Sequence, residues 1–309
     1  MTTERAWLID ASIYIFRAWF SMPDRWHTQD GMPVSAVYGY TKFLLDFLDM
    51  QGTEFYGVVA FDESLGSNYR NDIYPNYKVS RELPDDELAF QLDACRQVTQ
   101  KLGFTCYGGP RYEADDYLAS AARRYRQQGT PVTVVTRDKD LGQIIGGPDD
   151  AWWDFAQDVT LDEKSFYAKF GVRPNQFGDY LALVGDSIDD IPGVPGVGAK
   201  TAAALLQSYD TLAALEAGLT TVNALKIRGA AKVQERLIEH WPQVLVSRQL
   251  TGLADDIPEV SETPRFMLTE RALTSTIDYL ESLDLGGALP RRCKTLMASV
   301  SGTASQMGQ

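Results

Sequence analysis

The stretch "PVTVVTRDKDLGQIIG", residues 131–146, places two aspartates directly behind an apolar run. A short run rich in valine and threonine predicts a buried strand of a parallel sheet. Asp138 and Asp140 then lie where this strand ends and a helix begins. Two carboxylates this close repel one another unless water or a cation lies between them. The position predicts either a solvated turn or a cation-binding site.

Strand and helix patterns alternate on both sides of this stretch. Apolar runs predict further strands at residues 6–10, 55–62, 104–108 and 151–155. Apolar residues at helical spacing predict helices at residues 35–50, 85–103 and 113–129, with Ser35 as the expected N-cap of the first. Strands separated by helices predict an α/β fold with a mostly parallel sheet flanked by helices.

The pattern changes near residue 160, where strand signals stop and short helices separated by Gly and Pro follow one another. We therefore expect an α/β domain over residues 1–160 and a helical half over residues 161–292. The small, polar residues 297–309 predict a disordered tail.

Composition restricts the possible chemistry. The chain has 309 residues and two His, and its three Cys are scattered without a CxxC pair. Histidine-rich metal sites, zinc sites and Ser-His or Cys-His catalysis are therefore unlikely classes, so metal chemistry requires oxygen ligands. The formal net charge of −13 argues against a nucleic-acid partner unless positive charge is concentrated locally. The sequence shows neither a signal-peptide pattern nor an apolar run of membrane-spanning length, so we expect a cytoplasmic protein without a membrane partner.

Acidic residues recur at the ends of strands and at the starts of helices. A lone acid there is usually a turn or cap residue. The carboxyl ends of parallel strands meet in one crevice, however, so acids from several junctions converge. Their joint placement favours hard divalent cations, Mg²⁺ or Mn²⁺, of which two could hydrolyse a phosphodiester. The candidate metal ligands are Asp10, Asp62, Glu113, Asp115, Asp116, Asp138, Asp140, Asp186 and Asp189.

The segment "IPGVPGVGAKTAAALL", residues 191–206, combines three glycines with a following helix. Glycines allow a close approach of the backbone, and the free N–H groups of a helix start attract anions. The candidate phosphate contacts are Gly193, Gly196, Gly198, Lys200 and Thr201. The segment resembles the hairpin of helix-hairpin-helix DNA-binding motifs; a simple tight turn between two helices is the alternative.

Cations and aromatic residues alternate in "NYRNDIYPNYKVSRELPDD", residues 68–86. Arg70, Tyr77, Lys78 and Arg81 suit an unpaired nucleic-acid strand, since bases stack on aromatic rings and phosphates attract cations. A solvated loop would have a similar composition.

Four of these segments together resemble the 5′-3′ exonuclease and flap endonuclease family. They are "FDESLGSNYRNDIYPNYKVSR" (61–81), "YEADDYLAS" (112–120), "VTRDKDLGQI" (135–144) and "GDSIDDIPGVPGVGAKTA" (185–202). The likeness runs from about Trp7 to about Arg292 and is closest to the N-terminal nuclease domain of bacterial DNA polymerase I and its stand-alone relatives. No polymerase segment follows in this sequence, so a free-standing nuclease is expected.

The resemblance implies a PIN-like core with a helical arch at about residues 66–90 and a helix-3-turn-helix element in the helical half. It implies a monomer that cleaves branched or flapped duplex DNA near a single-strand/double-strand junction with two Mg²⁺ ions, leaving 5′ phosphates, alongside replication and repair proteins. Asp10, Asp62, Glu113, Asp115 and Asp116 match the family's first group of metal-associated acids, with Asp116 also counted as catalytic. Asp138, Asp140, Asp186 and Asp189 match the second group.

Further roles follow from the same resemblance. Lys78 and Arg81 match cations at the scissile phosphate, Tyr77 matches an aromatic that stacks on an unpaired base, and Arg17 matches a phosphate contact. The glycine segment with Lys200 matches the element that grips duplex DNA, where relatives can hold K⁺. Ile188 and Asp190 depart from the family, which usually carries a small polar residue and Asn, so the second metal site or the K⁺ site could be looser.

Three other functions fit parts of the sequence. A structure-specific DNA-binding protein without turnover would use the glycine segment alone. A phosphatase or phosphotransferase would use Asp138 or Asp140 as its nucleophile. A PIN-type ribonuclease would share the acids but cleave RNA.

Overall fold

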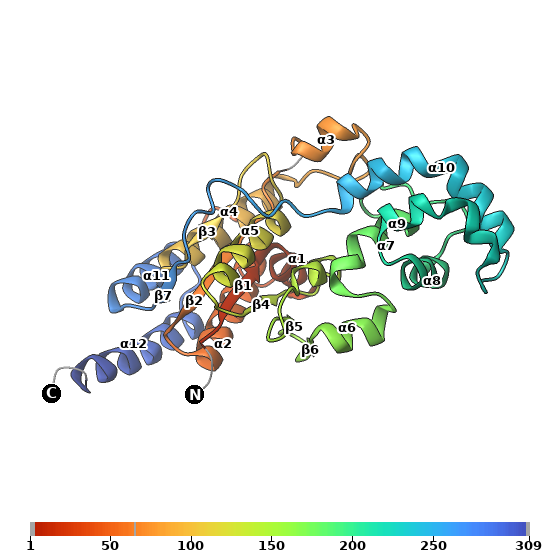
Figure 1. The fold of residues 1–309 in the computed structure, drawn as a ribbon. Helices are drawn as coiled ribbons and strands as arrows, with labels where there is room; N and C mark the ends of the chain where they lie inside the picture. Colours follow the sequence, from red (N-terminus) through yellow and green to blue (C-terminus); the bar gives the residue numbers. More distant parts are fainter. Residues whose placement is uncertain (1–3, 65, 307–309) are drawn as a thin grey trace.

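The computed structural model describes residues 4–64 and 66–306. A seven-stranded sheet forms the centre, in the order β3-β2-β1-β4-β5-β6, with β7 also paired to β2 (Figure 1). The strands are β1 (Ala6–Asp10), β2 (Glu54–Ala60), β3 (Cys106–Tyr107), β4 (Val132–Val135), β5 (Ala151–Asp154), β6 (Val159–Leu161) and β7 (Arg265–Met267). Strands β1 to β5 pair in parallel, whereas β6 and β7 add antiparallel edges. The predicted mostly parallel sheet is confirmed.

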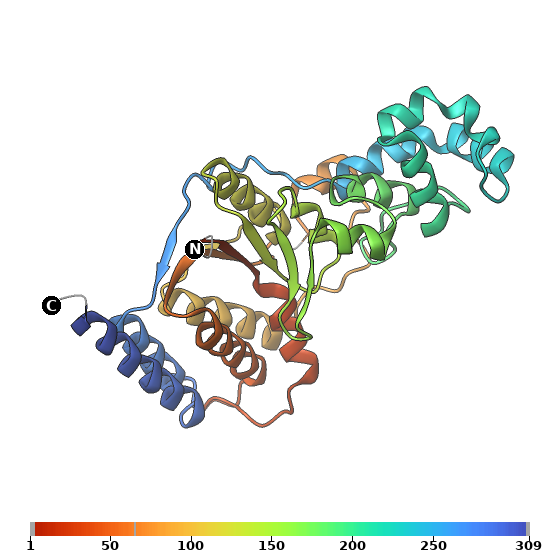
Figure 2. The ribbon, with the colours of Figure 1, turned by 60° about the horizontal axis from the view of Figure 1, so that its bottom comes forward.

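Helices cover both faces of this sheet (Figure 2). One face packs against α5 (Ala114–Gln127), and Leu8 of β1 belongs to that core. The next residue, Ile9, points to the other face and packs in the core with α2 (Ser35–Gln51) and α4 (Asp86–Lys101). Because neighbouring residues of a strand point to opposite faces, the continuous apolar run of β1 serves both cores.

The helix after β1 brings the first acid to the sheet edge. Asp10 is the N-cap of α1 (Ala11–Ser21), and its Oδ1 accepts a hydrogen bond from the Ile13 N–H at 3.3 Å. Ser35 is not the predicted N-cap of α2, because Val34 occupies that position and the Ser35 hydroxyl accepts from the Arg25 N–H at 3.4 Å.

A helical lobe extends to one side of the sheet (Figure 1). Its helices are α6 (Glu163–Phe170), α7 (Phe177–Val184), α8 (Ala199–Tyr209), α9 (Leu212–Ala217) and α10 (Ala230–Thr251). Two short 3-10 helices, Pro174–Gln176 and Leu219–Ala224, connect them. Residues 185–198 join α7 to α8 and contain the glycine segment.

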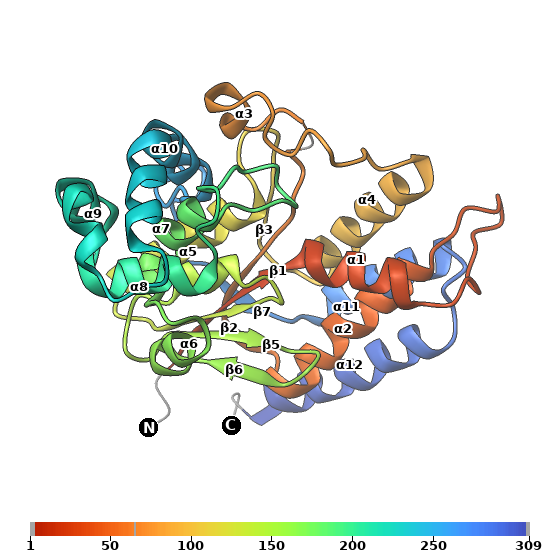
Figure 3. The same cartoon turned by 90° about the vertical axis from the view of Figure 1, so that its right-hand side faces the viewer.

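The chain then returns to the sheet, which corrects two expectations. Strand β7 pairs with β2, and α11 (Glu270–Ser282) and α12 (Ala288–Gln306) pack near α4 and α2 (Figure 3). The helical lobe therefore does not extend to residue 292. The disordered tail predicted from residue 297 is wrong as far as Gln306, because α12 is anchored by buried Cys293 and Leu296; residues 307–309 lie outside the described residues.

The predicted arch region is mostly not helical. Between residues 66 and 85 the described backbone forms one helix, α3 (Tyr69–Ile73), and the remainder is turns and irregular chain. Lys78 adopts a left-handed conformation with φ of 54° inside these turns. The region of about residues 66–90, expected to form an arch or clamp, thus contains α3, a folded turn above the sheet and the first residues of α4 (Figure 3).

No helix within residues 4–64 and 66–306 is long and apolar enough to pass through a bilayer.

Candidate active site

The first group of acids meets at the carboxyl ends of the central strands. Asp10 ends β1, Asp62 follows β2 and Asp138 follows β4. Burial, together with the charges of Asp138 and Asp62, raises the pKa of Asp10 to about 7, although Thr136 donates a hydrogen bond to its Oδ2 at 2.8 Å. Asp10 therefore experiences the charges of Asp138 and Asp62, as the sheet topology predicts.

Asp115 lies in the first turn of α5 and faces the same acids. Burial raises the pKa of its carboxyl group well above the usual range, and the charges of Asp138 and Asp10 raise it further. The N-terminus of a helix favours an anion. In Asp115 this effect does not compensate for the desolvation and the neighbouring carboxylates.

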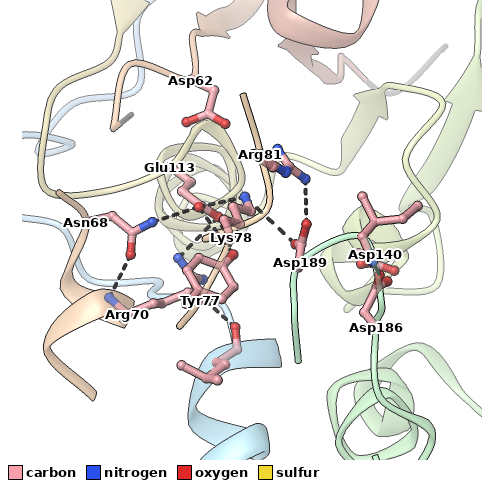
Figure 4. A network of polar contacts seen from close by, with 12 residues as sticks. Asp62, Asn68, Arg70, Tyr77, Lys78, Arg81, Glu113, Asp140, Asp186 and Asp189 are labelled. Carbon is pink, nitrogen blue, oxygen red and sulfur yellow. Dashed lines mark hydrogen bonds and ion pairs between the residues drawn. The ribbon is translucent and has the colours of Figure 1, made fainter. Parts of the chain in front are cut away.

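Asp138, Asp140 and Asp186 form the adjacent part of the site. The Asp140 N–H donates to Asp138 Oδ1 at 2.8 Å, so the backbone stabilises the Asp138 carboxylate next to that of Asp140. Lys139 Nζ lies 3.0 Å from Asp140 Oδ1 and 3.4 Å from Asp186 Oδ2 (Asp140 and Asp186 are shown in Figure 4). Burial and the charge of Asp138 still raise the pKa of Asp140 to about 7.

The donor chemistry of this cluster fits a hard divalent cation. The ligands on offer are carboxylate oxygens, which Mg²⁺ and Mn²⁺ prefer. The raised pKa values of buried Asp10 and half-buried Asp115 and Asp140 indicate carboxyl groups that lack sufficient positive charge around them. Among residues 4–64 and 66–306, no three His, Cys, Asp or Glu side chains are arranged to hold a metal ion as they stand.

The predicted phosphate-binding cations are paired with acids of the same site. Lys78 Nζ lies 2.6 Å from Glu113 Oε1 and 3.8 Å from Asp189 Oδ2 (Figure 4). Arg81 Nη2 lies 2.5 Å from Asp189 Oδ1. Burial raises the pKa of Glu113, but Lys78 and Arg70 outweigh it and lower this pKa overall. Glu113 and Asp189 thus already have counter-charges, unlike Asp10 and Asp115.

The turn that carries these cations is attached to the loop after α7. The Lys78 N–H donates to the Asp189 carbonyl oxygen at 3.0 Å. The N–H and hydroxyl of Ser80 donate to Asp190 Oδ2 at 2.8 Å and 2.7 Å. Asp190, a departure from the family, therefore holds the turn of Lys78 and Arg81 in place.

Two residues predicted to contact DNA are instead buried. Arg70 is 2% exposed and Tyr77 is 3% exposed. The Tyr77 hydroxyl donates to Glu113 Oε2 at 3.0 Å, so its ring faces the protein interior and is not available to stack on a base. From the sequence alone, alternating cations and aromatic residues could form either an exposed DNA-binding surface or a buried hydrogen-bond network.

Asp116 also has a different place from the one expected. It is fully buried, and its two carboxylate oxygens accept hydrogen bonds from Arg70, the Glu113 N–H and the Ala254 N–H. These partners occupy the lone pairs that a metal ion would use. The structure assigns Asp116 to the support of the site, while its neighbour Asp115 faces the other acids.

The glycine segment lies in the connection between α7 and α8, directly after Asp186 and Asp189; the N–H groups of Asp186 and Ile191 donate to each other's carbonyl oxygens at 2.9 Å and 2.8 Å. Gly193 passes so close to α7 that an added Cβ would lie 2.0 Å from the Val184 carbonyl oxygen. Gly196 has φ of +75° and lies against Arg236. Gly198 is the N-cap of α8, and Lys200 and Thr201 lie in the first turn.

Arg17 is exposed on α1. It lines a cavity of about 310 Å³ together with Lys42 and Phe155, and none of the nine candidate acids lines that cavity.

Supporting residues were missed by the sequence analysis. Thr136 holds Asp10, and Asn68 Nδ2 donates to Glu113 Oε1 at 2.8 Å (Figure 4). Asn68 is also the N-cap of α3, because its Oδ1 accepts from the Arg70 N–H at 2.7 Å. This local role could have been predicted from an Asn directly before a helix. Nothing local indicates its long-range bond to Glu113.

The sequence was also compared with protein-family models and with known proteins. Residues 5–171 match the model of the 5′-3′ exonuclease N-terminal resolvase-like domain, and residues 172–272 match that of the 5′-3′ exonuclease C-terminal SAM fold. DNA polymerase I of Rhizobium leguminosarum is 32% identical over 91% of this chain, but the match spans only 28% of that polymerase. A 5′-3′ exonuclease of Buchnera aphidicola is 29% identical over 81% of this chain and 86% of its own length.

Solved structures show the same fold at low identity. T5 5′-exonuclease with bound divalent zinc superposes over 96% of this chain and 99% of its own, with a TM-score of 0.64 and 17% identity. The catalytic core of Rad2 in complex with DNA substrate covers 96% of this chain and 92% of its own, with a TM-score of 0.61 and 16% identity. Both family models together extend over the sheet, the acids and the helical lobe. The chain belongs to the 5′-3′ exonuclease family.

Proposed function

We propose that the chain is a divalent-metal-dependent 5′ nuclease that acts on branched or flapped duplex DNA as a flap endonuclease and 5′-3′ exonuclease. It would hydrolyse phosphodiesters near a single-strand/double-strand junction and leave 5′ phosphates. One observation carries the proposal: buried Asp10 and half-buried Asp115 and Asp140, all with raised pKa values, gather at one sheet edge beside Lys78 and Arg81. Such a cluster requires cations, and phosphodiester cleavage uses them.

We place two Mg²⁺ ions, for which Mn²⁺ can substitute, among the acids of this edge. The residues that would hold them are Asp10, Asp62, Asp115, Asp138, Asp140 and Asp186. When bound, such ions lower the pKa of a water molecule and stabilise a leaving oxygen. Lys78 and Arg81 would exchange their carboxylate partners for the substrate phosphate, because both cations already stand next to the acids.

For the DNA grip we propose the turn between α7 and α8, acting as a helix-hairpin-helix element. Free backbone N–H groups at the start of α8, near Gly198 and Lys200, suit a phosphate. Carbonyl oxygens of the same turn are the proposed K⁺ ligands. Relatives named DNA polymerase I support a role beside replication and repair proteins, which we propose for a monomer in the cytoplasm.

The test compares a 5′-flap duplex, a nicked duplex, a blunt duplex and an RNA flap, each labelled at the 5′ end, with Mg²⁺, with Mn²⁺ and with EDTA. We expect metal-dependent products from the flap, absent in Asp138→Ala and retained in the matched surface variant Asp278→Asn, whose side chain is exposed on α11. Tight flap binding without any cleavage would favour the non-catalytic alternative. Preferential cleavage of RNA would favour the ribonuclease.

A further inference from the structure

Arg70 makes a set of buried hydrogen bonds that joins three distant parts of the chain. Its Nη1 and Nη2 donate to the two carboxylate oxygens of Asp116 at 2.7 Å and 2.8 Å. Its Nε donates to the Leu250 carbonyl oxygen and Nη2 also donates to the Gly252 carbonyl oxygen, both at 2.8 Å. A planar guanidinium satisfies these partners in one fixed orientation.

One side of this set is the first turn of α5. Asp116 accepts from the Glu113 N–H at 3.1 Å, which fixes the backbone on which Glu113 and Asp115 stand. Glu113 in turn holds Lys78. The orientation of Arg70 is therefore transmitted to acids and to a cation of the candidate active site (Figure 4).

The other side is the end of α10. The Ala254 N–H donates to Asp116 Oδ1 at 2.9 Å, so the chain leaving α10 is held from both sides. Higher in the same helix, the Ser247 hydroxyl donates to the Pro192 carbonyl oxygen at 2.7 Å, and Gln243 Nε2 donates to that of Gly193 at 3.3 Å. Helix α10 thus connects Arg70 with the glycine turn.

We propose that Arg70 is a positioning residue that fixes the distance between the turn that grips the duplex and the acids that cut it. It thereby determines which phosphodiester is cleaved. This inference rests on the proposed function. Arg70 touches no substrate, yet small misplacement of reacting groups costs about 100-fold in rate. Burial of the Arg70–Asp116 pair keeps water from competing for these bonds.

The main test is Arg70→Lys, which keeps the charge but cannot bind both oxygens of Asp116 and two carbonyl groups in one plane. On a labelled 5′ flap we expect kcat to fall by about 10- to 100-fold with KM within about 3-fold, and the single cut to spread over neighbouring phosphodiesters. In the DNA-free protein, hydrogen exchange should become faster at residues 248–254 and at the start of α5.

Two further variants separate positioning from stability. Arg292→Gln removes an ion pair between α12 and two acids of α2, Asp46 and Asp49, far along the chain from the site. It should lower Tm without changing the cut position. Ser247→Ala removes the shorter of the two hydrogen bonds between α10 and the glycine turn and should spread the cut in the same direction as Arg70→Lys, even if the latter fails to fold.

A single unshifted cut with wild-type kcat in folded Arg70→Lys or in Ser247→Ala would overturn the proposal. If Arg292→Gln spread the cut in the same way, the spreading would be a consequence of lower stability in general, and the proposal would also be overturned. If the wild-type protein cleaves none of the DNA substrates, the proposed function fails, whereas the exchange measurement still shows whether Arg70 joins α5 to α10.

Discussion

The ammonium group of Lys78 lies 2.6 Å from Oε1 of Glu113, so a cation expected at the substrate is paired with an acid expected near the metal. Burial lowers the pKa of Lys78, but Glu113 and Asp189 outweigh this effect and raise it, so the side chain stays charged. A substrate phosphate that binds Lys78 would take this donor from Glu113, whose carboxylate would keep the hydrogen bonds from Asn68 and Tyr77. Under the proposed function, the arrival of DNA would thus leave more negative charge beside the candidate metal ligands.

Replacement of Lys78 should therefore affect catalysis more than binding. We expect Lys78→Ala to lower the single-turnover rate by about 100-fold, the typical loss of one donor that stabilises transition-state charge. The Kd for a 5′-flap duplex, measured by fluorescence anisotropy in Ca²⁺, should change by less than about 3-fold. Lys164→Ala, an exposed cation of α6, is the control. If the Kd rose by as large a factor as the rate fell, Lys78 would contribute to DNA binding and not specifically to catalysis.

The fold was largely predictable because strand and helix periodicity is local. Strands β1, β2, β4 and β5 and helices α2, α4 and α5 lie at or near their predicted positions. Strand β7 has three residues and is defined by pairing with β2, more than 200 positions earlier in the chain, so no local pattern marks it. Helix α12 was not predicted, because its small, polar C-terminal residues are typical of disordered segments. Its buried Cys293 and Leu296 nevertheless pack in the same core as α2 and α4.

The site was predictable as a set of acids but not in its division of roles. Asp115 and Asp116 are neighbours in the sequence, and consecutive residues of a helix point in different directions. Whether Asp115 or Asp116 faces the cluster depends on where Arg70 lies. The position of Arg70 depends in turn on carbonyl groups at Leu250 and Gly252, about 180 residues away. No spacing rule reports such contacts.

Asp138 and Asp116 should give opposite phenotypes when replaced. Asp138→Ala should abolish cleavage while flap binding persists, and its Tm should not fall, because it removes one of several mutually repelling carboxylates. Asp116→Ala removes the closer acid of buried Arg70, leaving only Glu113 at 3.5 Å, and should cost about 3–5 kcal/mol of unfolding free energy. Its cleavage below Tm should be slower but require the same Mg²⁺ concentration. Thermal denaturation and Mg²⁺ titration of the rate check both.

A raised Mg²⁺ requirement in folded Asp116→Ala would show that Asp116 binds metal after all. Full activity of Asp138→Ala would count against the assignment of the acids.

Asp10 should make the metal-free protein less stable as pH rises. Its pKa is about 7 when folded and 3.8 when exposed, so the folded state holds the proton more tightly. This contribution to stability is complete below about pH 4 and is lost as pH rises towards 7. In EDTA at pH 8, the unfolding free energy of Asp10→Asn should therefore exceed that of the wild type by on the order of 4 kcal/mol, since the pKa change spans about three units of about 1.4 kcal/mol each. Urea unfolding at pH 5 and 8 measures the difference.

Mg²⁺ should reverse this ranking, because a bound cation stabilises the ionised carboxylate. We expect Mg²⁺ to raise the Tm of the wild type and of Asp278→Asn at pH 8, and to raise that of Asp10→Asn much less. An equal Mg²⁺ response in Asp10→Asn would exclude Asp10 as a ligand, whatever its effect on pH dependence.

Two glycines of the same turn should respond differently to alanine. An added Cβ at Gly193 would lie 2.0 Å from the carbonyl oxygen of Val184, whereas one at Gly198 would meet no atom within 4 Å. Because the obstacle at Gly193 is backbone, only a shift of the turn away from α7 could relieve it. Gly193→Ala should thus lower Tm and weaken duplex binding by at least about 10-fold. Gly198→Ala should keep the free energy of unfolding within about 1 kcal/mol of the wild type, because φ at Gly198 is −95° and the main cost is that Ala is a poorer N-cap than Gly. Thermal denaturation and fluorescence anisotropy with a blunt duplex measure the two effects separately. If both variants lost the same affinity for the duplex while Gly198→Ala kept its Tm, the turn would contact DNA through Gly198 itself.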